Sequence, residues 1–220
     1  MSRKIATVLG AVVGLLAGTQ NALAENNLFK GYAYHTPLEN YTTAKGYYDC
    51  SAEIGGTARC IDDLEFLGNK FTGALIFSDG KLVMVSLVRP YDQGAYTKAY
   101  TTLSKTFTLI SMTDDKTLLD LVDLAATSKS KEQYLSKVSS YENVGLSAGN
   151  LTYTFLEGAE VKPNLRSALS MLAVAPDTAR SADLIISGQG PETNLIMRFA
   201  YPKFEINKAV KEAQEPAEAF

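Results

Sequence analysis

The stretch FTGALIFSDGKLVMVSLV, residues 71–88, decides the fold, because two apolar, β-rich runs flank an Asp-Gly pair. Asp79-Gly80 tolerates the positive φ angles of tight hairpin turns, so the stretch predicts a β-hairpin of Phe71–Phe77 and Lys81–Val88. Helical spacing follows at Tyr96, Ala99, Tyr100, Leu103 and Phe107. This spacing predicts an amphipathic helix that packs on the hairpin.

Further elements are expected along the rest of the chain. Strands are expected at 107–112 (FTLISM) and 150–158 (NLTYTFLEG), and a second hairpin at 182–201. Three helices are expected, which bury in turn Leu118, Leu119, Val122 and Ala125; Tyr134, Leu135, Val138 and Tyr141; and Leu165, Ala168, Leu169 and Leu172 before Pro176. The fold class is therefore α+β, a largely antiparallel sheet from two β-hairpins with helices packed on one face.

The two hairpins resemble each other, since Leu75–Ser78 matches Leu184–Ser187 in character and Leu82–Met84 matches Leu195–Met197. Either the chain contains a two-fold internal repeat, or two apolar hairpins have converged on similar sequences. The unit from Phe71 to Phe107 also resembles hairpin-then-helix units of many small exported α+β domains.

The N-terminus has the pattern of a secretory signal peptide. Arg3 and Lys4 precede an apolar run from Ile5 to Gly18, and the small-residue series Ala22-Leu23-Ala24 follows. We expect cleavage between Ala24 and Glu25, because the run is shorter than the roughly 20 residues of a spanning helix. Residues 25–204 then form a single α+β domain, and 205–220 a frayed helix and flexible tail. Export predicts a periplasmic or secreted protein.

Charge argues against several classes of partner. The full chain holds 21 basic and 24 acidic side chains, and removal of Arg3 and Lys4 enlarges the acidic excess. A mildly acidic chain with no basic cluster is a poor candidate for binding nucleic acid or anionic membranes. After the signal, no apolar run approaches spanning length, so we expect no membrane span.

Cys50 and Cys60 are the two cysteines, and they predict one structural disulfide in an oxidising compartment. Their spacing differs from that of redox dithiols and the one histidine, His35, is not close by, so a redox or metal pair is disfavoured. We expect no metal and no cofactor. Asp62–Glu65 and Asp114-Asp115 lack the spacing of a calcium loop, and we interpret both as acids at helix starts.

Residues 25–62 are expected to form an irregular, tyrosine-rich arm that the disulfide pins to the domain. Tyrosine offers broad contact area and a hydroxyl group, which suits an envelope protein, peptide or glycan as partner. The candidate partner-binding residues are Tyr32, Tyr34, His35, Tyr41, Tyr47 and Tyr48. The alternative is that these rings cover the sheet as part of the core.

No catalytic residue is assigned. GLSAG, residues 145–149, matches G-x-S-x-G, but a nucleophile at Ser147 needs a strand before it and a helix after it. The patterns here predict a helix first and a strand afterwards, with Gly145 as the helix C-cap. Ser128-x-x-Lys131 lacks the companion motifs of penicillin-recognising enzymes. Gly188-x-Gly190 precedes a proline and a strand where a phosphate loop would open a helix.

These observations favour a non-catalytic binding or inhibitory module that is exported. Two alternatives stay open: a structural or assembly factor of the cell envelope, and an enzyme without a recognisable motif. A binding module needs a discrete exposed patch, an assembly factor a broader apolar surface, and an enzyme a concave site with convergent polar groups.

Overall fold

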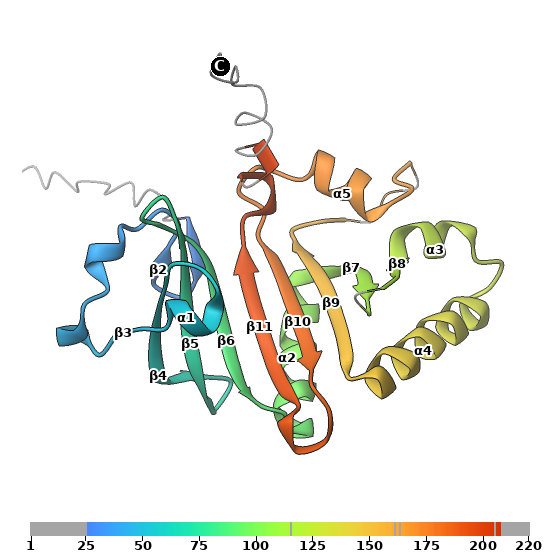
Figure 1. Ribbon diagram of the computed structural model, residues 1–220. Coiled ribbons are helices and arrows are strands. Elements are labelled where there is room, and N and C mark those ends of the chain that lie inside the picture. The colour runs from blue at the N-terminus through green and yellow to red at the C-terminus, as the bar shows by residue number, and fades with distance from the viewer. Residues whose placement is uncertain (1–25, 115, 161, 163, 205, 208–220) are drawn as a thin grey trace, which may run out of the picture.

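The structure is a computed structural model that describes residues 26–114, 116–160, 162, 164–204 and 206–207. The signal peptide, its cleavage site and nearly all of the C-terminal tail lie outside these residues. The expected α+β fold is confirmed: nine strands form one sheet in the order β3-β4-β5-β6-β11-β10-β9-β7-β8, and every pairing is antiparallel. A small two-stranded sheet, β1 and β2, accompanies it (Figure 1).

The strands of the large sheet are β3 (Tyr48–Asp49), β4 (Ala58–Phe66), β5 (Asn69–Ser78), β6 (Lys81–Pro90), β7 (Phe107–Thr113), β8 (Leu118–Asp120), β9 (Asn150–Glu157), β10 (Ser181–Ser187) and β11 (Asn194–Ala200). The small sheet contains β1 (Asn27–Phe29) and β2 (Tyr32–Ala33). The helices are α1 (Ser51–Ile54), α2 (Gln93–Thr106), α3 (Leu121–Thr127), α4 (Lys131–Ala148) and α5 (Ala168–Val174). Short 3-10 turns occur at Leu38–Asn40, Thr43–Lys45 and Gly190–Glu192.

Both expected hairpins are present. Asp79 and Gly80 have φ angles of 51° and 71°, so the β5–β6 turn has the backbone that the Asp-Gly pair predicts. The β10–β11 loop is longer and includes the 3-10 turn at Gly190–Glu192. The two hairpins are neighbours in one sheet through the β6–β11 pairing, which does not establish an internal repeat.

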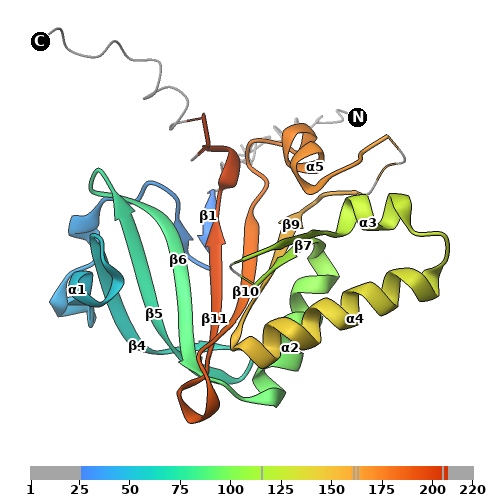
Figure 2. The ribbon, with the colours of Figure 1, turned by 45° about the vertical axis from the view of Figure 1, so that its right-hand side comes forward.

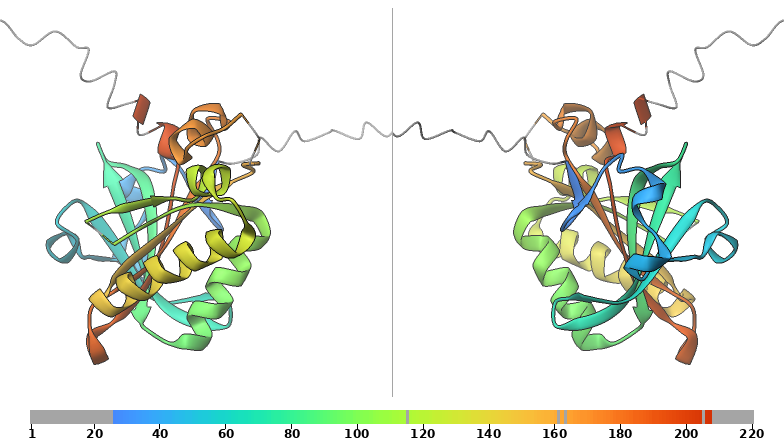
Figure 3. Two further views of the ribbon diagram at one scale, coloured as in Figure 1. Left: turned by 90° about the vertical axis from the view of Figure 1, so that its right-hand side faces the viewer. Right: turned by 90° about the vertical axis from the view of Figure 1, so that its left-hand side faces the viewer.

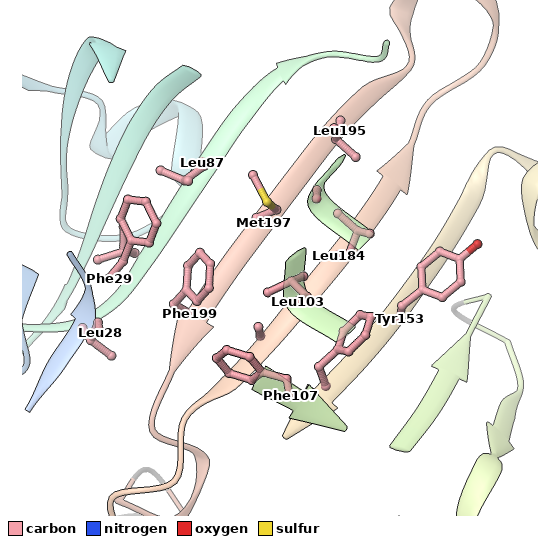
Figure 4. Packing of buried hydrophobic residues seen from close by; sticks show 14 of the residues in the cluster. Leu28, Phe29, Leu87, Leu103, Phe107, Tyr153, Leu184, Leu195, Met197 and Phe199 are labelled. Atoms are coloured by element: carbon pink, nitrogen blue, oxygen red, sulfur yellow. The ribbon is translucent and has the colours of Figure 1, made fainter. Parts of the chain in front are cut away.

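Helix α2 packs against one face of the sheet, which we call the core face. Asp92 starts the helix by accepting a hydrogen bond from the Ala95 N–H at 2.8 Å, and Ala95, Ala99 and Leu103 are buried. Leu103 faces Phe107 and Leu184 in Figure 4. In Figure 1, α2 lies behind the strands.

The N-terminal strand β1 covers the neighbouring part of the core face. Leu28 and Phe29 are buried, and the Phe29 ring stacks on Phe199 of β11 with centroids 5.0 Å apart. Figure 4 shows both residues beside Leu87 and Phe199. Helix α2 and strand β1 therefore cover neighbouring parts of the core face.

In the described part of the chain, the opposite face is covered toward the two edges of the sheet. Toward one edge of the sheet, Met171 of α5 packs with Leu156 of β9 and Ile110 of β7. Toward the other edge, the disulfide packs with Ala58 of β4 and Ala74 of β5, beside α1. Figure 2 shows α5 at one end of the strands and the β10–β11 loop at the other.

The segment after β7 differs from the expected helix. Leu118–Asp120 form strand β8, because the free edge of β7 pairs with them, and Leu118 is 65% exposed. The helix starts at Leu121, where Asp120 Oδ1 accepts hydrogen bonds from the next backbone N–H groups. Asp114 starts no helix; it accepts from the N–H groups of Lys116 and Thr117 in a turn.

Strand β4 was missed within the expected irregular arm. A register shift between Ile61 and Leu64 interrupts its alternation, and Asp63 there has a φ of 56°. The prediction that Asp62–Glu65 start a helix is therefore wrong. These acids lie on an outer strand of the sheet, where charge and a bulge discourage pairing with another chain (Figure 3).

Two predicted helices are present with different buried positions. In α4, Tyr134, Val138 and Tyr141 pack on the core, whereas Leu135 is exposed because it lies on another side of the helix. In α5, Met171 is buried and Leu169 is 71% exposed. Among the described helices, none combines the length and apolar character required to cross a membrane.

Candidate functional site

The tyrosine arm lies mainly against the core. Tyr41 is only 8% exposed, and its ring contacts those of Tyr47 and Phe77 at 5.2 and 5.5 Å. Tyr32 and Tyr34 are partly buried and also pack on the core cluster. Desolvation raises the pKa of Tyr41, as expected for a phenol removed from water. Four of the six candidate residues, Tyr32, Tyr34, Tyr41 and Tyr47, therefore have a packing role.

His35 and Tyr48 are the two exposed candidate residues, and the structure does not bring them together. His35 stacks on Tyr34 with ring centroids 3.9 Å apart, and its backbone N–H donates to the Leu82 carbonyl near the start of β6. Tyr48 lies on β3 at the far edge of the large sheet, where its hydroxyl donates to Asp62 Oδ1 at 3.0 Å.

The disulfide prediction is confirmed. Cys50 and Cys60 are bonded, with their Cα atoms 5.8 Å apart, and both are buried. The bridge joins the start of α1 to strand β4 and so fixes the end of the arm on the sheet.

Ser147 lies in the last turn of α4, and its hydroxyl donates to the Asn143 carbonyl at 2.7 Å. The predicted order of helix then strand is confirmed, so the serine does not stand on a nucleophile elbow. The prediction that Gly145 is the C-cap is wrong, because Gly149 has the left-handed φ of 75°. Gly145 instead allows close contact with β9: a Cβ there would lie 2.7 Å from Leu151 Cδ1.

Three surface hollows were considered as small-molecule sites. One of about 240 Å³ lies between α5 and the segment before it, and one of about 290 Å³ between Leu67 and α2. A third, of about 340 Å³, contains Ser128, Ser130 and Lys131 at the start of α4. Hydrogen bonds from its own backbone N–H and from Ser130 lower the pKa of Glu132, so this carboxylate already occupies the helix start.

Metal binding finds no support in the described part of the chain, where no three His, Cys, Asp or Glu side chains gather into a possible ligand set. Gly188-x-Gly190 forms the loop between β10 and β11, as its proline and following strand indicated. A Cβ at Gly188 would lie 2.5 Å from the Glu192 carbonyl oxygen, so this glycine closes the loop.

The centre of the sheet face opposite α2 is a more distinctive surface. We call it the open face, because no helix of the described residues crosses β6, β11 and β10 on the side toward the viewer in Figure 1. Antiparallel register places its side chains in rows across the strands. The central rows are Ser86, Arg198, Asp183 and Thr154; Val88, Ile196, Ile185 and Thr152; and Asn194, Ser187 and Asn150.

Arg198 and Asp183 are the two charged side chains in these central rows. They are direct cross-strand partners, and Thr154 is the partner of Asp183 on its other side. Arg198 is exposed, while Asp183 is partly buried. Burial raises the pKa of Asp183, and its hydrogen bond with Thr154 and the nearby Arg198 only partly oppose this shift.

Exposed apolar side chains surround this centre. Leu118 of β8 is in the same row as Ile185 and Ile196, through Thr113 and Thr152. Leu169 of α5 is also exposed, and Asp120 Oδ2 holds α5 at this rim by accepting from the Ala168 N–H at 2.8 Å. Tyr48 lies at the opposite edge, directly across from Cys60, and is the one candidate tyrosine on this face.

A buried cluster of hydroxyl groups holds α4 beside α2 on the core face. Tyr153 donates a short hydrogen bond to Glu142 Oε1, and Tyr96 donates to the Tyr153 oxygen at 3.0 Å. Desolvation, followed by the bond to Glu142, raises the pKa of Tyr153, and desolvation raises that of Tyr96 to about 12. Both hydroxyls therefore keep their protons, and we assign the cluster a packing role.

Sequence reasoning missed the open face, although a signal for it was present. Asp183 and Arg198 alternate with apolar residues in the second hairpin, and alternation places both on one side of the sheet. Comparison with known proteins found no matching family model, no matching curated protein and no matching solved structure.

Proposed function

We propose that this chain is an exported, non-catalytic binding or inhibitory module that binds a protein partner through the open face of its sheet. The observation that carries the proposal is the composition of this face. One exposed arginine beside a partly buried aspartate lies among aliphatic and hydroxyl side chains. Protein interfaces have such centres, poor in charged residues and rich in apolar contacts, with arginine as a frequent anchor.

A protein partner fits this face better than a glycan does. The central rows contain no aromatic ring for a sugar to stack on, since the rings of β9 and β11 point to the core face. Ile196, Val88 and Thr152 instead offer aliphatic surface that another protein can cover.

Binding is favoured over catalysis because the charged groups of the open face lie apart from the three hollows described above. None of the three hollows described above includes Asp183 or Arg198. An enzyme needs reacting groups that converge on an enclosed substrate. A raised carboxyl pKa on a sheet surface fits a desolvated interface residue as well as it fits a general acid.

Export is supported by two independent features. The first 24 residues have the pattern of a secretory signal, and the disulfide Cys50–Cys60 suits an oxidising compartment. We therefore place the protein in the periplasm or outside the cell. Mass spectrometry of the exported fraction should find an N-terminus at Glu25.

Photo-crosslinking in cells that export the protein tests the binding surface. A photoreactive amino acid replaces Ile196 on the open face, Lys98 on α2 or Tyr34 in the arm, one at a time. We expect protein adducts of discrete mass from position 196 and none from position 98. Adducts from position 34 with none from position 196 would return the partner surface to the tyrosine arm.

A further inference from the structure

We infer that the open face binds a second copy of this chain, with a two-fold axis that runs parallel to the strands between β10 and β11. The inference rests on the proposed function, because it names the partner of the same surface. Its basis is that each side chain of the open face on β11 or β6 has a chemically complementary side chain in the same row on β10 or β9. A two-fold axis along the line between β10 and β11 would therefore bring complementary side chains of two copies together.

The charged pair gives the first part of the argument. Arg198 on β11 and Asp183 on β10 stand directly opposite each other on the two sides of the line. The two-fold axis exchanges β10 and β11, so Arg198 of each copy would face Asp183 of the other. Two intermolecular ion pairs would form at the centre of the interface, where burial strengthens them.

The neighbouring rows match in the same way. Ile196 is partly exposed and lies opposite Ile185, which is 6% exposed, so the axis brings Ile196 of each copy over the Ile185 position of the other. One strand further out, Val88 on β6 corresponds to Thr152 on β9, two β-branched side chains of similar volume. Apolar contact therefore surrounds the ion pairs.

The hydroxyl and amide groups also correspond. Ser86 on β6 corresponds to Thr154 on β9, and Asn194 on β11 corresponds to Ser187 on β10. Ser86 is buried, whereas Asn194 and Ser187 are partly exposed and can exchange hydrogen bonds across the interface, because each of these two side chains is both a donor and an acceptor. No row would bring like charges together.

The arrangement is compatible with how sheets pack. Two sheets that meet face to face lie about 10 Å apart with their strands nearly aligned, and an axis along the strands preserves that alignment. The same operation carries α5 to the end of β6 that holds Met84 in the second copy. The exposed Leu169 and Val174 of α5 would gain apolar partners there.

Sedimentation velocity of the mature wild-type chain, from about 1 to 200 µM, tests the inference, and we expect a reversible dimer. Arg198→Asp makes both central groups acidic, and Asp183→Arg makes both basic. Each variant alone should be monomeric, because like charges raise the dimer dissociation constant at least ~100-fold. A 1:1 mixture of the two variants should form a dimer, because opposite charges then face each other in both contacts.

Lys98→Asp on the exposed side of α2 is the matched control for Arg198→Asp, since it changes the net charge equally, and it should dimerise like the wild type. If Asp183→Arg does not fold, Asp183→Lys takes its place, both alone, where it should be monomeric, and in the mixture, where it should dimerise. A wild type that is monomeric at every concentration overturns the inference, and so does a mixture that stays monomeric. Crosslinking from position 196 to a different protein would then still support the proposed function.

Discussion

Tyr153→Phe is a sharp test of how the sheet and its helices are held together. The Tyr153 side chain is fully buried and its hydroxyl donates to Glu142 Oε1, so the change removes one oxygen without opening a large cavity. Glu142 of α4 then has only the Tyr96 hydroxyl, at 3.4 Å, from this cluster. A buried hydrogen bond to a carboxylate contributes about 1.5–3 kcal/mol, so we expect a loss of about 2 kcal/mol.

That loss corresponds to a fall in Tm of about 4–8 °C for a domain of this size. Tyr100→Phe is the matched control, because Tyr100 contacts the Tyr153 ring with centroids 5.6 Å apart, yet its hydroxyl makes no hydrogen bond with any residue that the structure describes. We expect the control to change stability by less than about 0.5 kcal/mol. Urea unfolding followed by circular dichroism gives both values. Equal values for the two variants would refute a stabilising role for the Tyr153–Glu142 bond.

Three further predictions concern the disulfide, the packing of α4 and the open face. Reduction of Cys50–Cys60 should lower the free energy of unfolding by about 3 kcal/mol, because the bridge restricts the unfolded chain. Calorimetry with and without reductant measures this loss, and an unchanged Tm would contradict the prediction. Gly145→Ala should destabilise the protein by about 1–2 kcal/mol in urea unfolding, because the new methyl group meets the buried Leu151 side chain at 2.7 Å. A gain in stability, as expected for alanine at an ordinary helix position, would instead show that α4 can move away from β9. Burial raises the native pKa of Asp183, so the contribution of this carboxyl group to stability falls as pH rises from its unfolded pKa of about 3.9 through its native pKa. The Tm of Asp183→Asn minus the Tm of the wild type should therefore grow across pH 3–7. A Tm difference that does not depend on pH would contradict a raised pKa.

The fold was predictable where local signals agree. The Asp79-Gly80 turn and its apolar flanks fixed the β5–β6 hairpin, and helical spacing after it predicted α2. Strand β4 was not predictable in the same way, because its register shift interrupts the period of two. Strand β8 forms only because β7 offers a free edge, and such a tertiary partner has no local signal.

The site was less predictable than the fold, for a physical reason. A cluster of tyrosines indicates contact area equally well in a core and at an interface, and here most of the rings pack inward. The open face depends on which strands are neighbours. Arg198 and Asp183 become partners through the second hairpin, but Ser86 and Thr154 join their row only through the β6–β11 and β9–β10 pairings.

Hydroxyl-radical footprinting, read by mass spectrometry, tests most directly the claim that the open face is a binding surface. Met84 on β6 is partly exposed at this face, whereas Leu135 on α4 is exposed elsewhere. Both should be oxidised in dilute purified protein, and Met84 should become protected in intact cells that export the protein while Leu135 does not. Equal oxidation of Met84 in the two settings would contradict a partner on the open face.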